Sequence, residues 1–147
     1  MSPTTRAHIV ELYIVPKRAL SSAPIPLPIE MLQTIKWWAG VALPVDYRAR
    51  FGATLPAANV TSPDVEAWGL EDANYIEVES EAGRAIRVSA RIDVRRPDAR
   101  LAAALITFAR AAGAALVQSD GSAIELTAGG FGLALRSSAA WRHVHAQ

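Results

Sequence analysis

Residues 74–127 constrain the fold more than any other part of this sequence, because their hydrophobic periods are unambiguous. Residues 75–80 and 84–94 alternate apolar with polar side chains, as half-buried strands of an antiparallel sheet do. The apolar side chains of both strands must share one face, so the loop between them should have an odd number of residues. A loop of three residues meets this condition and places Glu77 opposite Arg87 as an exposed ion pair.

A helix and a second hairpin are expected to complete this stretch. Residues 98–112 carry apolar side chains every three or four positions, which predicts a helix with one buried face, and a glycine follows its end. Residues 115–118 and 123–127 are short apolar runs on either side of the turn-forming sequence Ser-Asp-Gly-Ser. Core packing, turns and exposed charges account for most residues of the stretch, which is therefore interpreted as a scaffold.

The flanking segments add one strand and two helices. Residues 7–15 are rich in Ile, Val, Leu and Tyr and end at Pro16, which predicts a first strand. Residues 28–39 begin with a proline and are followed by a glycine, as is typical of a helix. Residues 131–144 predict a third helix, and the proline-rich residues 16–28 are expected to be extended.

This order of elements predicts an α+β fold in a single domain over residues 1–147. We expect an antiparallel-rich sheet of about five strands with helices packed on one face. The order partly resembles the split β-α-β arrangement of ferredoxin-like folds, a resemblance of topology that implies no chemistry. Residues 41–73 show no sustained period and are expected to form an irregular insertion, where functional residues are often found.

Composition argues against several classes of function. The sequence has no cysteine, which rules out disulfides and thiolate chemistry. Fifteen Lys and Arg residues balance fourteen Asp and Glu residues, so the net charge of +1 argues against a nucleic-acid partner. No apolar run reaches about 18 residues, and Glu11 interrupts the N-terminal run, so neither a membrane span nor a signal peptide is expected. We therefore expect a cytoplasmic bacterial protein.

The residues that could carry catalysis or hold a metal lack the partners that such chemistry needs. His143 and His145 are spaced as two metal ligands, but no third ligand lies near them in the sequence. Ser137 and Ser138 have no base within the same motif. The Gly-Gly-Phe-Gly sequence at 129–132 lacks the lysine of a phosphate loop and the spacing of a dinucleotide fingerprint. We therefore assign no catalytic residue, metal or cofactor.

The remaining signal consists of tryptophan and arginine, which are enriched at the hot spots of protein interfaces. On a helix over residues 28–39, Trp37 would lie on the polar face and would need a cover, either the insertion or another protein. The leading hypothesis is a non-catalytic protein-interaction domain, such as an adaptor or an immunity-type inhibitor of a toxin. The candidate partner-binding residues are Trp37, Trp68, Arg91 and Arg95.

Packing within the chain is the simpler explanation for each of these residues. The insertion could fold back so that Trp68 packs near Trp37, and the arginines could form ion pairs with Asp93 and Asp98. If Trp37 is buried within one chain, the interaction hypothesis loses its main support.

Two alternatives stay open at this stage. A small-ligand-binding protein or an enzyme would have a pocket between the sheet and the insertion. That pocket would be lined by Trp68, Tyr47 or Tyr75, with Arg91 or an acid converging on it. A free edge strand would also allow the chain to form a homodimer.

Overall fold

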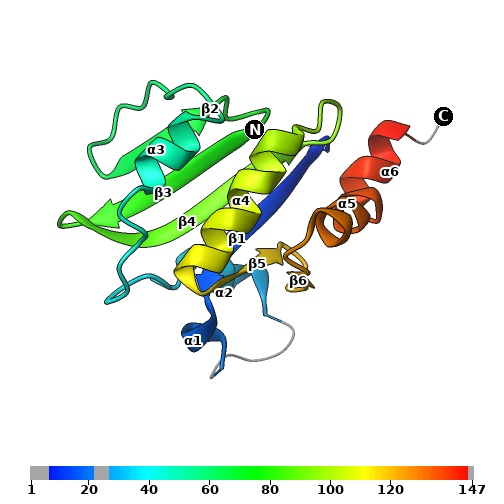
Figure 1. Ribbon diagram of the computed structural model, residues 1–147. Coiled ribbons are helices and arrows are strands. Elements are labelled where there is room, and N and C mark those ends of the chain that lie inside the picture. The colour runs from blue at the N-terminus through cyan, green and yellow to red at the C-terminus, as the bar shows by residue number, and fades with distance from the viewer. Residues whose placement is uncertain (1–6, 22–26, 146–147) are drawn as a thin grey trace.

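Six strands form one antiparallel sheet in the computed structural model, which describes residues 7–21 and 27–145 (Figure 1). The spatial order of the strands is β2-β3-β4-β1-β5-β6. The strands are β1 (Ile9–Pro16), β2 (Val65–Gly69), β3 (Tyr75–Glu81), β4 (Arg84–Asp93), β5 (Ala114–Gln118) and β6 (Ala123–Ile124). The helices are α1 (Lys17–Leu20), α2 (Ile29–Thr34), α3 (Tyr47–Gly52), α4 (Ala99–Ala112), α5 (Ala128–Arg136) and α6 (Ala139–His145). The predicted α+β fold is confirmed, with six strands in place of about five.

Four of the strands follow the split β-α-β pattern. The chain passes from β1 to β3 by way of α3, yet β4 lies between these two strands. It passes from β4 to β5 by way of α4, and β1 lies between them. This is the ferredoxin-like arrangement that the element order resembled, and β2 and β6 extend the sheet at its two edges.

Helix α4 covers one face of the sheet and supplies the centre of the core. Its N-terminus is capped by Asp98, whose carboxylate accepts hydrogen bonds from the N–H groups of Arg100 and Leu101 at 2.9 and 3.3 Å. Its C-terminus ends at Gly113, which has the left-handed φ of 64° that glycine adopts at this position. Both ends lie where the sequence predicted them.

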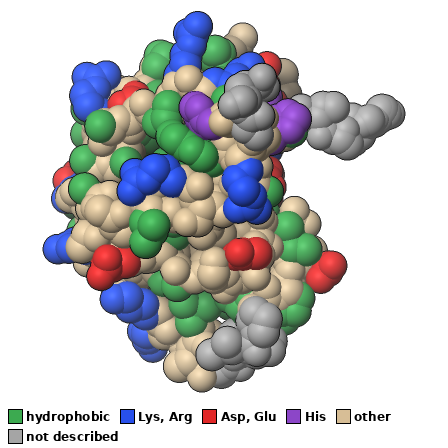
Figure 2. Space-filling model, turned by 90° about the vertical axis from the view of Figure 1, so that its right-hand side faces the viewer, with side chains coloured by type: hydrophobic (Ala, Val, Ile, Leu, Met, Phe, Trp, Pro, Cys, Tyr) green, Lys and Arg blue, Asp and Glu red, His purple; other side chains and the backbone are tan. Residues whose placement is uncertain are grey.

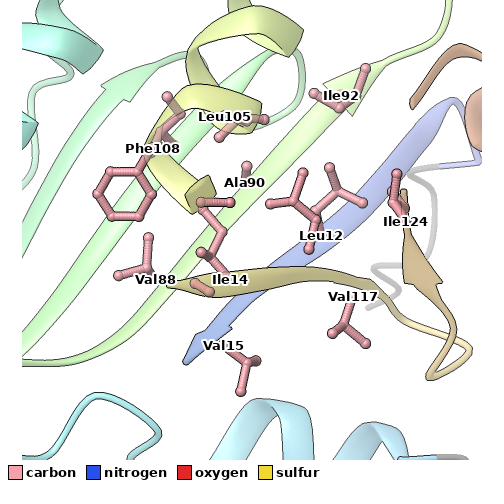
Figure 3. Close-up of a cluster of buried hydrophobic side chains, with 14 of the residues drawn as sticks. Leu12, Ile14, Val15, Val88, Ala90, Ile92, Leu105, Phe108, Val117 and Ile124 are labelled. Carbon is pink, nitrogen blue, oxygen red and sulfur yellow. The ribbon is translucent and has the colours of Figure 1, made fainter. Parts of the chain in front are cut away.

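Figure 3 shows how the sheet and α4 pack together. Leu12 and Ala90 point toward Leu105 and Phe108 of α4, whereas Val15 points to the opposite side of the sheet. All five side chains are at most 1% exposed. The core therefore lies mainly between α4 and the central strands β1 and β4.

The opposite face of the sheet is covered at one end by α2. The side chain of Gln33 donates to the hydroxyl of Tyr13 at 3.4 Å, and Arg87 donates to the carbonyl of Thr34 at 2.9 Å. Tyr13 and Arg87 both project from this face, because their neighbours along each strand fill the core beneath α4. Helix α4, with α3 and α5 beside it, thus covers one face of the sheet, and α2 covers the end of the other.

The hairpin of β3 and β4 forms as expected, but its loop and register differ from the prediction. The loop has two residues, Ala82 and Gly83, with φ values of 52° and 78°. A β-bulge between strands β3 and β4 supplies the extra residue that keeps the apolar side chains on one face. As a result Arg87 lies opposite Glu79, with its Nε 3.0 Å from Oε1, and the predicted pair with Glu77 is wrong.

The first predicted helix is shorter than its hydrophobic pattern indicated. Helix α2 ends at Thr34, and Ile35 is extended with a ψ of 139°. The chain then bonds to the sheet, since Trp38 donates its backbone N–H to Ile86 and its indole N–H to Ile14, at 3.0 and 2.7 Å. A helical wheel drawn over residues 28–39 therefore misplaces Trp37.

Other short elements also depart from the sequence-based expectations. The predicted irregular insertion contains α3 and β2, and the proline-rich segment contains α1, while residues 22–26 of that segment lie outside the described residues. The third helix is divided into α5 and α6 near Ser138, whose hydroxyl accepts a hydrogen bond from the N–H of Trp141 at 3.1 Å and so caps α6. Elements of four to seven residues are too short to show a clear hydrophobic period.

Candidate functional site

The two tryptophans predicted to bind a partner are buried. Trp37 and Trp68 are each 7% exposed, and the indole N–H of Trp37 donates to the carbonyl of Leu32 at 3.4 Å. The ring of Trp68 packs edge to face against Phe51 and Tyr47, with centroids 5.3 and 6.4 Å away. The expectation that Trp37 lies on the polar face of a helix is wrong, because α2 ends before it, and the burial of Trp37 removes the main sequence-based support for an interaction surface.

The two arginines predicted as partner contacts are engaged within the chain. Arg95 forms a two-pronged ion pair with Asp93, at 2.9 and 2.8 Å, and this pair holds the pKa of the Asp93 carboxyl below its usual value. Arg91 donates to the backbone carbonyl of Glu71 at 2.8 Å and stacks over the ring of Tyr75. The four candidate residues therefore do not form one partner-binding surface, because the two tryptophans are buried and the two arginines are bonded within the chain.

The aromatic residues expected to line a pocket lie in or against the core. Tyr47 packs against Phe51 and donates its hydroxyl proton to Glu66, and burial, with this carboxylate beside it, raises the pKa of Tyr47 to about 12. Tyr47, Trp68 and Tyr75 line none of the three prominent cavities on the described part of the surface. The alternative of a pocket against the insertion gains no support from these cavities.

The most voluminous of the three cavities lies beside β1 and has a volume of about 1000 Å³. Its lining comes from the start of β1 (residues 9–11), the turn between β5 and β6 (residues 118–122) and the junction of α5 and α6 (residues 134–142). We call this cavity the strand-edge groove. In Figure 1, α5 and α6 lie beyond the end of β5, beside the first half of β1.

One side of the strand-edge groove is an unpaired length of β1. On the side of β4, β1 is paired from Ile9 to Ile14. On the side of β5, it is paired only from Leu12 to Pro16, and Leu12 faces Gln118 in the last pair. The first three residues of β1 therefore have a strand on one side only.

The backbone groups of Ile9 and Glu11 point into the groove. In an antiparallel pair, successive residues direct their N–H and C=O groups to opposite sides. The carbonyl of His8 accepts from Val94 of the β4 side, while the N–H of Lys17 donates to Gly113 of the β5 side, both at 3.0 Å. The N–H and C=O groups of odd-numbered residues therefore face β5. Among the described residues, neither the β1–β5 ladder, which ends at Leu12, nor any other backbone hydrogen bond engages Ile9 or Glu11 on that side.

The turn between β5 and β6 explains why the ladder ends at Gln118. The N–H of Gly121 donates to the carbonyl of Gln118 at 2.9 Å, and Gly121 has a φ of 88°. Asp120 accepts hydrogen bonds from the N–H and the hydroxyl of Ser122 at 2.8 and 2.6 Å, which lowers the pKa of Asp120. This turn was predicted from the sequence, and it leads the chain away from β1 before β5 can cover Ile9 and Glu11.

The opposite wall of the groove is lined by small side chains. Ala134 and Ala139 of α5 and α6 leave space that longer side chains would fill. Arg142 donates to the carbonyl of Ser137 at 2.7 Å, and among the described residues it forms no ion pair with an acidic side chain. Figure 2 shows the side on which α5 and α6 lie, where acidic, basic and hydrophobic side chains are interspersed.

The groove is suited to binding a chain by its backbone. Ile9 and Glu11 each offer one N–H and one C=O group, which are strong hydrogen-bonding groups that extended peptides satisfy. Among the described residues, no three His, Cys, Asp or Glu side chains are grouped so that they could hold a metal. This site was not predicted from the sequence. One signal was present: the predicted first strand, residues 7–15, is about twice as long as the predicted fourth strand, residues 115–118.

Comparisons with known proteins add no identification. No family model matches the chain, and no curated protein or solved structure shows significant similarity to it. Among the described residues, no helix has both the length and the apolar character that crossing a membrane requires.

Proposed function

We propose that this protein is a non-catalytic protein-interaction domain that binds an extended segment of another protein in the strand-edge groove. The segment would add to the sheet as a strand beside β1, in line with β5. The observation that carries this proposal is the pairing of β1, which has β4 along its first three residues but no strand on the other side. Strand addition is an established mode of peptide recognition.

The other edges of the sheet are less suited to accept a strand. The outer edge of β2 is covered, since Ala58 donates to Ala67 at 2.9 Å and Gly69 donates to Pro56 at 2.7 Å. The edge strand β6 has only two residues. Proteins protect exposed edges in this way because an open edge recruits other chains. The first three residues of β1 are therefore better able to accept a strand than the protected edges are.

The available hydrogen bonds indicate an interaction of moderate strength. Ile9 and Glu11 offer two donors and two acceptors, and each hydrogen bond contributes about 0.5–1.5 kcal/mol net. Side chains of the bound segment would add contacts with the wall formed by α5 and α6. An adaptor or an immunity-type inhibitor acting in the bacterial cytoplasm is the class of protein that we propose. The bound segment belongs to a different protein, and binding by a second copy is an outcome that the test distinguishes.

Selection from a library of random peptides tests this proposal. Peptides that bind the intact chain are selected, and their affinities for two variants are then measured. Ala139→Trp fills the groove, whereas Ala111→Trp places the same side chain on the exposed surface of α4. We expect Ala139→Trp to weaken the binding of the selected peptides by about ten-fold or more, and Ala111→Trp to change their binding by less than about two-fold. Circular dichroism confirms that both variants are folded.

Three results would overturn the proposal. The first is that no peptide binds the intact chain, and the second is that Ala139→Trp and Ala111→Trp affect binding equally. The third is a concentration-dependent dimer that Ala139→Trp abolishes, because the groove would then serve self-association. Sedimentation of the intact chain and both variants detects that dimer.

A further inference from the structure

A second cavity, with a volume of about 610 Å³, lies between α4 and α5. Its lining is mainly apolar and includes Ile92, Phe131 and Leu135, which are at most 7% exposed. Polar groups lie toward its ends, with Asp98 at the start of α4 and Arg110 near the end of that helix. We call this cavity the interhelical cleft, and it shares no residue with the strand-edge groove.

The cleft exists because small residues face one another across it. Ala99, Ala102 and Ala103 of α4 lie on one wall, and Gly132 of α5 lies on the other. Ala99 and Ala103 are exposed while Phe131 and Leu135 are buried, so the space is a cleft open to solvent with an apolar floor. Ligand-binding cavities typically have volumes of about 300–1000 Å³ and mostly apolar walls.

The shape of the cleft restricts what can occupy it. Its lining extends along α4 over residues 98–110, which corresponds to about 18 Å at a rise of 1.5 Å per residue. The Cα atoms of α4 and α5 approach within 8 Å of each other. A helix with its side chains is about 10–12 Å wide, which exceeds this closest approach, so a helix cannot reach the floor of the cleft where α4 and α5 meet. A linear hydrocarbon chain is long and thin enough to do so.

One end of the cleft carries a positive charge. Arg110 donates from Nε and from a terminal nitrogen to the carbonyl of Leu126, with the Nε at 3.1 Å, and these bonds hold the guanidinium at the rim. In the described part of the chain, Arg110 forms no ion pair with an acidic side chain. Asp98, toward the other end, is already used as the cap of α4. Charge complementarity therefore favours an anionic group at the Arg110 end.

We propose that the interhelical cleft binds one linear aliphatic chain that ends in a carboxylate, with the carboxylate beside Arg110. The hydrocarbon replaces water along Ile106, Phe131 and Leu135, and burial of its methylene groups drives binding. The carboxylate forms a charge-assisted hydrogen bond with the guanidinium. This activity is independent of the strand-edge groove.

Calorimetric titration of the intact chain with decanoate, and with decanol as the uncharged match, tests the proposal. Ala103→Trp fills the cleft, and Ala111→Trp places the same side chain on the same helix outside it. We expect Ala103→Trp to weaken decanoate binding by about ten-fold or more and Ala111→Trp by less than about two-fold. Arg110→Gln should weaken the binding of decanoate by about five-fold and change the binding of decanol by less than about two-fold.

The alternatives give distinct results. Absence of saturable decanoate binding, or equal effects of Ala103→Trp and Ala111→Trp, would overturn the assignment of the cleft. Equal effects of Arg110→Gln on decanoate and decanol would overturn the role of the charge. Tighter binding of decyl phosphate than of decanoate would overturn the carboxylate as the head group. Thermal unfolding of each variant confirms that it is folded.

Discussion

Leu12 lies opposite Gln118 in the last pair that joins β1 to β5. Beyond this pair, β1 continues for three residues toward its start, whereas the chain of β5 turns away. The three open residues of β1 thus result from a strand of eight residues beside a strand of five. Because α5 and α6 lie beyond that gap, the unpaired backbone faces a groove with a wall.

Proline scanning of β1 tests which backbone groups are unpaired. Glu11→Pro removes an N–H that points into the groove and a weak ion pair with Arg91 at 3.5 Å, so it should cost less than about 1 kcal/mol of the free energy of unfolding. Val10→Pro removes an N–H that points to β4, and it should cost about 3 kcal/mol or more. Urea unfolding of both variants measures the difference. Equal destabilisation would show that Glu11 is paired as Val10 is.

Trp37 is predicted to stabilise the fold rather than to bind a partner. Its side chain is 7% exposed, so Trp37→Ala should lower the free energy of unfolding by about 3–5 kcal/mol. Leu133→Ala is the control, because Leu133 is 61% exposed and should change stability by less than about 0.5 kcal/mol. A Trp37→Ala variant as stable as the parent chain would contradict the burial of this ring.

The two-residue loop of the β3–β4 hairpin offers a stabilising substitution. Ala82 has a φ of 52°, a conformation that costs an alanine about 1–2 kcal/mol. Asparagine tolerates this conformation and is favoured before glycine in such turns, so Ala82→Asn should stabilise the protein by about 0.5–1 kcal/mol. The same change at Ala111 in α4 should be destabilising, since asparagine is a weaker helix former. Thermal unfolding compares the two variants. A lower melting temperature for Ala82→Asn than for the parent chain would contradict the left-handed conformation of residue 82 in this turn.

The ion pair of Asp93 and Arg95 should make stability depend on pH in the acid range. Hydrogen bonds from Arg95 lower the pKa of Asp93 in the folded protein from its ordinary value of 3.8. The stabilisation is therefore complete above about pH 5 and is lost as the pH falls through the folded value. Asp93→Asn should cost about 1–3 kcal/mol at neutral pH, and the deficit should shrink below about pH 4. A deficit that is independent of pH would contradict this assignment.

The predictable and unpredictable parts of the structure differ in the range of the interactions that determine them. Helix α4 and the β3–β4 hairpin have enough residues to show their periods, and Asp98 and Gly113 mark the ends of α4 by local chemistry. The end of α2 was missed, because Trp38 leaves the helix to bond with strand β1, which is distant in sequence.

The candidate site was missed for the same reason. The turn around Gly121 could be recognised locally, but its effect depends on β5 lying beside β1, which no local pattern reveals. The sequence-based search instead selected residue types enriched at interfaces, and those side chains serve the core or internal ion pairs. The binding groups of the strand-edge groove are the backbone N–H and C=O groups of Ile9 and Glu11. The amino-acid type at a position does not show whether its backbone groups are paired.

Amide hydrogen exchange measured by NMR on the free protein tests the central claim most directly. The N–H of Leu12 is bonded to β4, whereas the N–H of Glu11 points into the strand-edge groove. The account predicts that the Glu11 amide exchanges about 100-fold faster than the amides of Val10 and Leu12, and that a bound peptide slows it. Protection of the Glu11 amide equal to that of Leu12 in the free protein would contradict it.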